Sequence, residues 1–261
     1  VANVAFTGNG SSVASSFTPN NDGTFIFGAS GGTQTYNGGL NTASVDGTVT
    51  LNGTIATSND AVVLGAVTLG SATTVDTNAT SNVADITIAA ITGGSNTLTL
   101  TTENNVTGAD VTASGAIAGV TTLTLASVGG TATLSADVDV TTLAVDNTVL
   151  NVAFTGNGSS VANSFTPAND GTFIFGTSGG TQTYNGGLNT ASVDGTVTLN
   201  GTIATSNDAV VLGAVTLGSA TTVDTNASSD AGDITVAAIT GGSNNLTLST
   251  GDNITGADIT A

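Results

Sequence analysis

The chain has 261 residues with no Lys, Arg, His, Cys, Met or Trp, whereas its 18 Asp and Glu residues give a formal net charge of −18. Without cationic side chains it cannot neutralise phosphates, which excludes nucleic-acid binding and direct binding to anionic membranes. Without Cys it has neither disulfides nor zinc-thiolate sites. A hydrophobic share of 39% argues against a disordered acidic tail.

Six segments in chain order alternate apolar and small polar residues with a period of two, as strands with one buried face do. They are residues 47–53, 65–71, 84–90, 96–102, 121–127 and 141–147. Asn-Gly, Asp-Gly and Gly-Gly pairs between them mark turns. No segment carries an apolar stripe at helical spacing, so we expect an all-β protein with almost no helix.

The chain also repeats itself. Residues 3–14, NVAFTGNGSSVA, return unchanged as residues 151–162, and at this offset of 148 residues 14 of 111 aligned positions differ while 97 are identical. We therefore divide the chain into a first repeat unit, 1–148, and a second unit, 149–261, that stops before the tail of the repeat. Long internal repeats are typical of solenoids and arrays, so we expect a window of a larger repetitive protein. The two copies should be related by translation along one axis with a small rotation.

Two architectures suit this pattern, a run of immunoglobulin-like sandwiches and a parallel β-helix, or β-solenoid. A unit of 148 residues is long for one sandwich and short for two, whereas residues 121–140 have the form of one coil with three short strands. We predict one continuous solenoid with coils of about 20 residues, about seven per unit and about 13 in the chain, giving a rod on the order of 60 Å long.

Four phrases carry a resemblance to a protein family: GTQTYNGGL (32–40), DAVVLGAVTLGSATTVDT (60–77), ADITIAAITGGSNTLTL (84–100) and GVTTLTLASVGG (119–130). They resemble the β-strand repeats of filamentous-haemagglutinin-type exoproteins and autotransporter passengers of bacteria. This resemblance implies secretion to the extracellular or cell-surface space, a right-handed parallel β-helix, and a role in adhesion or surface structure. The acidic composition also resembles some bacterial surface-layer proteins that assemble with calcium, although the glycine-aspartate nonapeptide of calcium-binding rolls is missing.

Calcium is the one cofactor that the residues suggest, because it binds six to eight oxygens from carboxylates, amides and carbonyls. The candidate ligands are Asp22, Asp60, Asp137, Asp139, Asp170 and Asp208. The alternative is that these residues serve their turns, since Asp and Asn side chains bond to nearby backbone.

Aromatic residues gather in the first quarter of each unit, where they either form a carbohydrate-stacking platform or pack in the core. Phe25 and Phe27 alternate with Ile26, which favours the core. Tyr36 and its copy Tyr184 are the best candidates for an exposed ligand contact. Segments 9–23 and 157–171 have the weakest strand pattern and are expected to leave the coil as loops; each contains one of the two Pro residues, Pro19 and Pro167.

Two functions remain open. The first is a structural repeat segment of a large secreted bacterial surface protein, a stalk, filament or layer whose partners are further repeats or other copies of itself. The alternative is an adhesin module that binds a surface glycan or host protein through 9–23 and 157–171. We expect no enzyme, because lyases of acidic sugars need Lys or Arg and no carboxylate pair stands out for glycoside hydrolysis.

Overall fold

The computed structural model describes residues 2–229, 231–251 and 256–261, and in these residues it contains strands and turns without any helix. No helix that could cross a membrane is therefore present in the described part of the chain. The first unit carries β1 (Val4–Phe6), β2 (Ser11–Val13), β3 (Phe25–Phe27), β4 (Thr33–Tyr36), β5 (Leu40–Asn41), β6 (Val49–Thr57), β7 (Val62–Asp76), β8 (Ile86–Thr92), β9 (Leu98–Thr101), β10 (Val111–Ala113), β11 (Ile117–Ala126), β12 (Thr131–Leu134) and β13 (Val138–Val145). The second carries β14 (Asn151–Phe154), β15 (Ser160–Val161), β16 (Phe173–Phe175), β17 (Thr181–Tyr184), β18 (Leu188–Asn189), β19 (Val197–Ala204), β20 (Val210–Ala227), β21 (Ile234–Thr240), β22 (Leu246–Gly251) and β23 (Ile259–Thr260).

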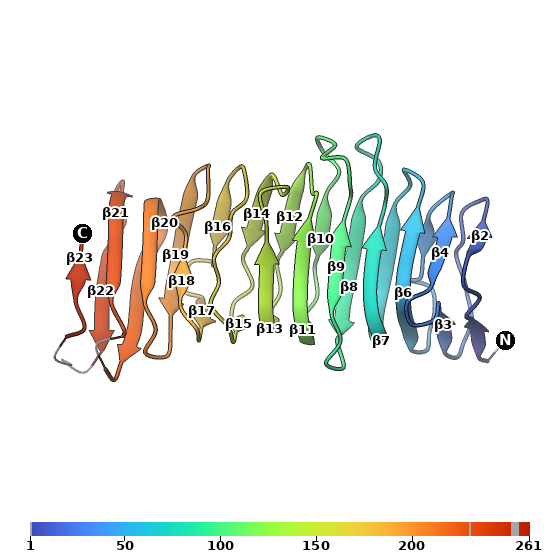
Figure 1. The fold of residues 1–261 in the computed structure, drawn as a ribbon, viewed down its shortest axis with the longest axis horizontal. Coiled ribbons are helices and arrows are strands. Elements are labelled where there is room, and N and C mark those ends of the chain that lie inside the picture. Colours follow the sequence, from blue (N-terminus) through green and yellow to red (C-terminus); the bar gives the residue numbers. More distant parts are fainter. Residues whose placement is uncertain (1, 230, 252–255) are drawn as a thin grey trace.

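The strands stack in parallel, coil on coil, into a rod with the N-terminus at one end and the C-terminus at the other (Figure 1). The prediction of a parallel β-solenoid is confirmed. The predicted total of about 13 coils is wrong, because a coil takes about 22 residues and the chain makes about 11 turns. Corner connections cause the difference, since they lengthen some turns, such as the one that separates the paired residues Ile91 and Ile117.

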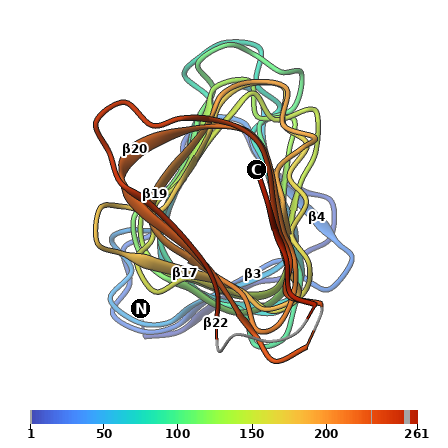
Figure 2. The same cartoon turned by 90° about the vertical axis from the view of Figure 1, so that its left-hand side faces the viewer.

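Seen from the end, the coil is roughly triangular, so the rod has three sheet faces (Figure 2). Face A holds β1, β3, the start of β6, the middle of β7, the end of β8, the starts of β11 and β13, β15, β17, the ends of β19 and β20, and β22. Face B holds β2, β4, the end of β6, the end of β7, β9, the ends of β11 and β13, β18, the starts of β20 and β21, and β23. Face C holds β5, the starts of β7 and β8, β10, β12, β14, β16, the start of β19, the middle of β20 and the end of β21.

The core is one continuous apolar cluster that runs through both units, from Phe25 to Val236. Strands point alternate residues into it: Phe25 and Phe27 are buried, whereas Ile26 between them is only half-buried. Burying an aliphatic or aromatic side chain of this size is worth about 1.5–3 kcal/mol. Because the core has no break at the unit boundary, the two units form a single stack.

The repeat unit does not contain a whole number of turns. From Val4, six turns along face A lead to Val138. Val152, the copy of Val4, lies two-thirds of the way along the next turn, which joins the paired residues Asp139 and Ser160. Val152 accordingly pairs on face C, where its neighbour is Ala132 of β12. One unit therefore spans six and two-thirds turns.

The second unit is consequently turned by one-third around the rod relative to the first. Segments of the first unit on faces A, B and C return on faces C, A and B, as β3 and β16, β4 and β17, and β5 and β18 illustrate. The expectation of a small rotation is wrong, because the number of residues in the corners, which the repeat pattern does not reveal, sets the phase of the unit.

Gly201 marks the corner where β19 passes from face C to face A. Its φ is +66°, and a Cβ atom there would lie 2.4 Å from the carbonyl oxygens of Gly180 and Thr177 in the neighbouring coil. Gly179 also has a positive φ, +74°, but a Cβ atom there would meet nothing within 4 Å. Substituting Ala at Gly179 and at Gly201 therefore separates the free-energy cost of the backbone conformation from that of the contact between coils.

We expect Gly179→Ala to lower the free energy of unfolding by about 1–2 kcal/mol, because a residue with a Cβ atom is strained at positive φ. Gly201→Ala should cost about 2 kcal/mol more, because two coils must also move apart. Urea unfolding of both variants measures the difference. Equal losses would show that inter-coil contact at Gly201 is not limiting.

Candidate functional site

The six Asp residues that sequence analysis selected as calcium ligands are spread along the rod. The exposed ones are Asp22, Asp139 and Asp170, and the half-buried ones are Asp60, Asp137 and Asp208. Across the described residues, no group of three or more acidic side chains lies close enough together to hold a metal ion. The structure does not bring the candidates together, and calcium binding stays a prediction from sequence.

Asp60 illustrates the turn interpretation. The Thr57 hydroxyl donates a hydrogen bond to the backbone carbonyl of Asp60 and accepts one from its N–H, which closes a tight turn. The same two bonds recur at Thr205 and Asp208 in the second unit. The backbone of these residues therefore serves the corner between face B and face C in one unit, and the equivalent corner in the next.

Two Asp residues that sequence analysis missed have a clearer role. The Asp85 carboxylate accepts the N–H of Asp110 at 2.9 Å, and the Asp110 carboxylate accepts the N–H of Thr131 at 2.7 Å. Each carboxylate thus bonds to the backbone of the next coil. The signal that could have found them is the motif of a small residue, Asp, an apolar residue and Thr, which begins at Ala84 and again at Ala109.

The pKa of the Asp76 carboxyl group is raised, and its neighbours along the chain do not reveal the shift. Partial burial is the main cause and the facing Glu103 carboxylate adds to it, whereas a hydrogen bond from the Asn78 N–H opposes the shift. In the second unit Gly251 stands in place of Glu103, so the carboxylate that faces Asp76 has no counterpart at that aligned position.

The expectation that Tyr36 and Tyr184 are exposed is wrong, because both side chains are completely buried. The Tyr36 hydroxyl donates to the side-chain oxygen of Gln34 at 2.9 Å, and the Gln34 amide donates to the Phe6 carbonyl. Burial raises the pKa of both tyrosines. The Tyr36 ring stacks on Phe17 at 5.7 Å between centroids. The aromatic residues thus form core, as the alternation around Ile26 suggested.

Segments 9–23 and 157–171 do not leave the coil as expected. Residues 11–13 form β2, which pairs with β4 in parallel, and Phe17 bridges to Leu40. In the copy, β15 pairs on both sides and Phe165 bridges to Leu188. Inter-coil pairing overrides the weak strand propensity of these segments, because each of them lies against a regular strand.

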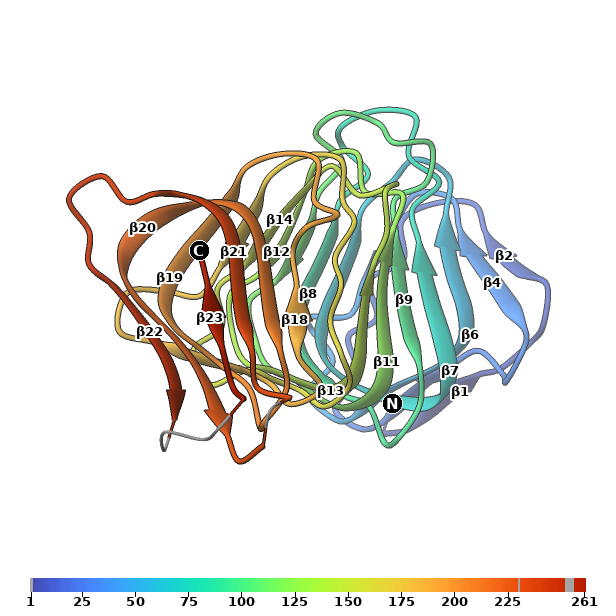
Figure 3. The same cartoon turned by 60° about the vertical axis from the view of Figure 1, so that its left-hand side comes forward.

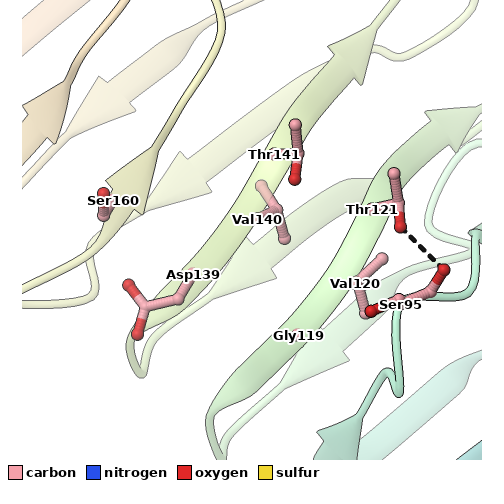
Figure 4. A pocket seen from close by; sticks show the side chains of 8 residues that line it. All are labelled: Ser95, Gly119, Val120, Thr121, Asp139, Val140, Thr141 and Ser160. Atoms are coloured by element: carbon pink, nitrogen blue, oxygen red, sulfur yellow. Dashed lines mark hydrogen bonds between the residues drawn. The ribbon is translucent and has the colours of Figure 1, made fainter.

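Open grooves lie between neighbouring strands on the surface of the rod. One, of about 330 Å³, is lined by Asp139, Thr121 and Ser95, and the Thr121 hydroxyl donates to the Ser95 carbonyl at 2.8 Å across it (Figure 4). Another, of about 350 Å³, contains Asp46 and recurs in the second unit with Asp194. Each groove contains one carboxylate among its described lining residues, whereas glycoside hydrolysis uses two.

Two corner connections of the first unit, residues 77–85 and 102–110, stack on each other and protrude from the edge between faces B and C (Figure 3). We call this pair the double loop. Ala79, Ala84 and Ala109 are fully buried inside it and form a small apolar cluster apart from the main core. It departs from the triangular outline of the coil (Figure 2).

Comparison with models of known protein families, with curated proteins and with solved structures found no significant match.

Removing the Glu103 charge should stabilise the protein at neutral pH. An acid whose pKa is raised on folding makes stability fall as pH rises from its unfolded pKa through its folded pKa, and the loss is complete above that window. Glu103→Gln should therefore raise the melting temperature by about 1–3 °C at pH 7 and low salt, a small effect because Asp76 is partly solvated. At pH 3, where the raised pKa leaves the Asp76 carboxyl group largely protonated, the two proteins should melt together.

The matched control is Asp76→Asn against Asp224→Asn. The change at position 76 should stabilise more at pH 7, because the second unit has Gly251 at the position of Glu103. Equal effects at the two positions would rule out Glu103 as a cause.

Tyr184→Phe should lower the free energy of unfolding by about 1–3 kcal/mol, because it leaves the buried side-chain oxygen of Gln182 without its donor. The double variant Tyr184→Phe/Gln182→Leu also removes the amide that lost its donor. Its loss of unfolding free energy should therefore be smaller than the sum of the losses in the two single variants. A double-mutant cycle by urea unfolding provides the measurement, and strict additivity would contradict the coupling.

Proposed function

We propose that this chain is a structural repeat segment of a large secreted bacterial surface protein, a stalk, filament or layer element located outside the cell. The observation that carries the proposal is the single apolar core that continues across the boundary between the two units. A rod of this kind lengthens with each added unit without a new type of interface, because each new coil pairs with the last one as its predecessors do.

The dimensions suit a spacer. About 11 turns at a rung spacing of about 4.8 Å give a rod of about 53 Å, and one unit of six and two-thirds turns accounts for about 32 Å of it. Near-identical copies favour this role over recognition, since length needs many copies whereas a binding site needs one. The partners in the proposal are further repeats or other copies of the chain.

Three further features support the proposal. The resemblance of residues 60–77 and 84–100 to the repeats of bacterial exoproteins favours secretion. The uniform negative charge favours solubility and limits adhesion to anionic surfaces. The proposal includes no catalysis, because the sequence contains no Lys, Arg or His to serve as a base, a nucleophile or a cationic group at a reaction centre.

The adhesin alternative requires segments 9–23 and 157–171 to be free binding loops. No structural observation favours that assignment, because β2 and β15 bind these segments into the sheet.

Antibodies raised against the purified chain test the proposal on cells of the organism that encodes it. They should label intact cells, and electron microscopy should place the label on rods or a layer at the surface. Labelling that requires permeabilised cells would overturn the proposed location and with it the proposed role.

A further inference from the structure

The double loop is a rigid, preformed surface. Its loops are bonded to each other where the Ala79 N–H donates to the Thr102 carbonyl at 2.7 Å and the Asn104 amide donates to the Ala79 carbonyl at 3.1 Å. Its tip is clamped by Asn59, whose side-chain oxygen accepts the N–H groups of Thr80 and Ser81 at 2.6 and 2.7 Å. A surface ordered in advance binds a partner without a large cost in conformational entropy.

The double loop is also where the two units differ. It provides 18 of the 111 aligned positions, yet it holds seven of the 14 differences: Thr80, Asn82, Val83, Ala84, Glu103, Asn104 and Val106. Their counterparts in the second unit are Ser228, Asp230, Ala231, Gly232, Gly251, Asp252 and Ile254, of which Asp230, Asp252 and Ile254 lie outside the described residues. The other 93 positions hold the remaining seven differences.

This variation is not a general property of loops in the chain. The connection of residues 14–24, which has 11 positions, differs at Ser15 and Asn20, and the connection of residues 42–48 does not differ at all. Loops that vary on a constant scaffold are where proteins most often place recognition. The concentration of differences therefore selects the double loop from all the corners of the rod.

The exposed chemistry of the double loop indicates the kind of partner. Val83 is 59% exposed, the highest value among the large hydrophobic residues of the described chain. Val83 lines a shallow groove with Leu40 and Asp60, and elsewhere on the double loop Asn82, Asn105 and Glu103 are exposed. The chain carries no cation that could neutralise Glu103, and a second copy of the chain brings none to this surface either. A partner with positive charge complements this surface.

We propose that the double loop of the first unit is a docking surface for a partner protein that presents an apolar side chain together with a Lys or Arg side chain. Val83 contacts the apolar group and Glu103 binds the cation, which also relieves the repulsion between Glu103 and Asp76. The second unit has Ala231 and Gly251 at these positions and therefore does not bind the same partner.

The test uses the whole chain and a phage-displayed library of random 12-residue peptides as the probe. The chain is immobilised and peptides are selected for binding at low salt, without counterselection. The selected peptides should be enriched in Lys or Arg near an apolar residue. The variant Val83→Ala/Glu103→Gly, which places the second unit's own residues in the first, should bind them at least tenfold more weakly. It should fold normally, because glycine suits the positive φ of Glu103, +52°.

The matched control is Ser15→Asn/Asn20→Ala, which also exchanges first-unit loop residues for those of the second unit and should leave binding unchanged. Peptides that bind the Val83/Glu103 variant as well as the wild type, peptides without cationic enrichment, or no selected peptides would each overturn the proposal. Calcium binding by titration calorimetry that is lost with Glu103→Gly would identify a metal site instead. A dimer in sedimentation that is lost in the same variant would identify a second copy as the partner.

Discussion

In-register parallel pairing between successive coils is the interaction on which the whole rod depends. It places like residues above one another, as Val49 over Val67 and Leu51 over Leu69. Because the rung spacing is fixed at about 4.8 Å, every inward side chain must match the volume of its neighbours, while the corners absorb differences in coil length. The short turn between Val49 and Val67 and the long turn between Ile91 and Ile117 therefore belong to the same stack without breaking its faces.

The phase of the repeat follows from the same constraint. A unit of six and two-thirds turns is tolerated only if the three faces are interchangeable, because each segment of the second unit meets neighbours on another face. The local environment of a residue is set by the rungs above and below it and by whether it points inward. β4 on face B and β17 on face A satisfy the same rules, and the tyrosine that ends each strand is equally buried.

Sequence alone could predict what depends on local pattern. The period of two located strand segments such as 47–53 and 121–127, and it identified Phe25 and Phe27 as core. Properties that depend on closure of the coil could not be predicted in this way. Tyr36 borders an Asn-Gly turn signal, yet its ring is covered by Phe17 and its hydroxyl by Gln34, which reach it only through the fold. The rotation between units and the pairing of segment 9–23 depend on corner lengths in the same manner.

The candidate site residues show the same difference between local sequence pattern and contacts between coils. The Asn residues beside Asp22 and Asp60 in the sequence made them candidate calcium ligands, but such clusters of Asn and Asp mark turns. Asp85 acts across coils on Asp110, and Glu103 likewise faces Asp76 from the next coil. Patterns between neighbouring positions in the sequence do not reveal contacts between residues that are one coil apart. A comparison of the two units does reveal which corners differ.

The absence of cations poses a physical problem that the coil geometry solves. A carboxylate needs partners, and in this chain none can come from a charged side chain. Asp85, Asp110 and Asp233 instead accept backbone N–H groups of the next coil, and Asn151 does the same for Thr172. These bonds join successive coils at the corners, where the sheet pairing of the faces is interrupted. Because each of these acids bonds to the neighbouring coil, every added unit brings both the carboxylates and the backbone N–H groups that donate to them. Glu103 differs from these acids because it faces another carboxylate on a protruding loop, so an external cation has more to contribute there than at the acids that bond to the next coil.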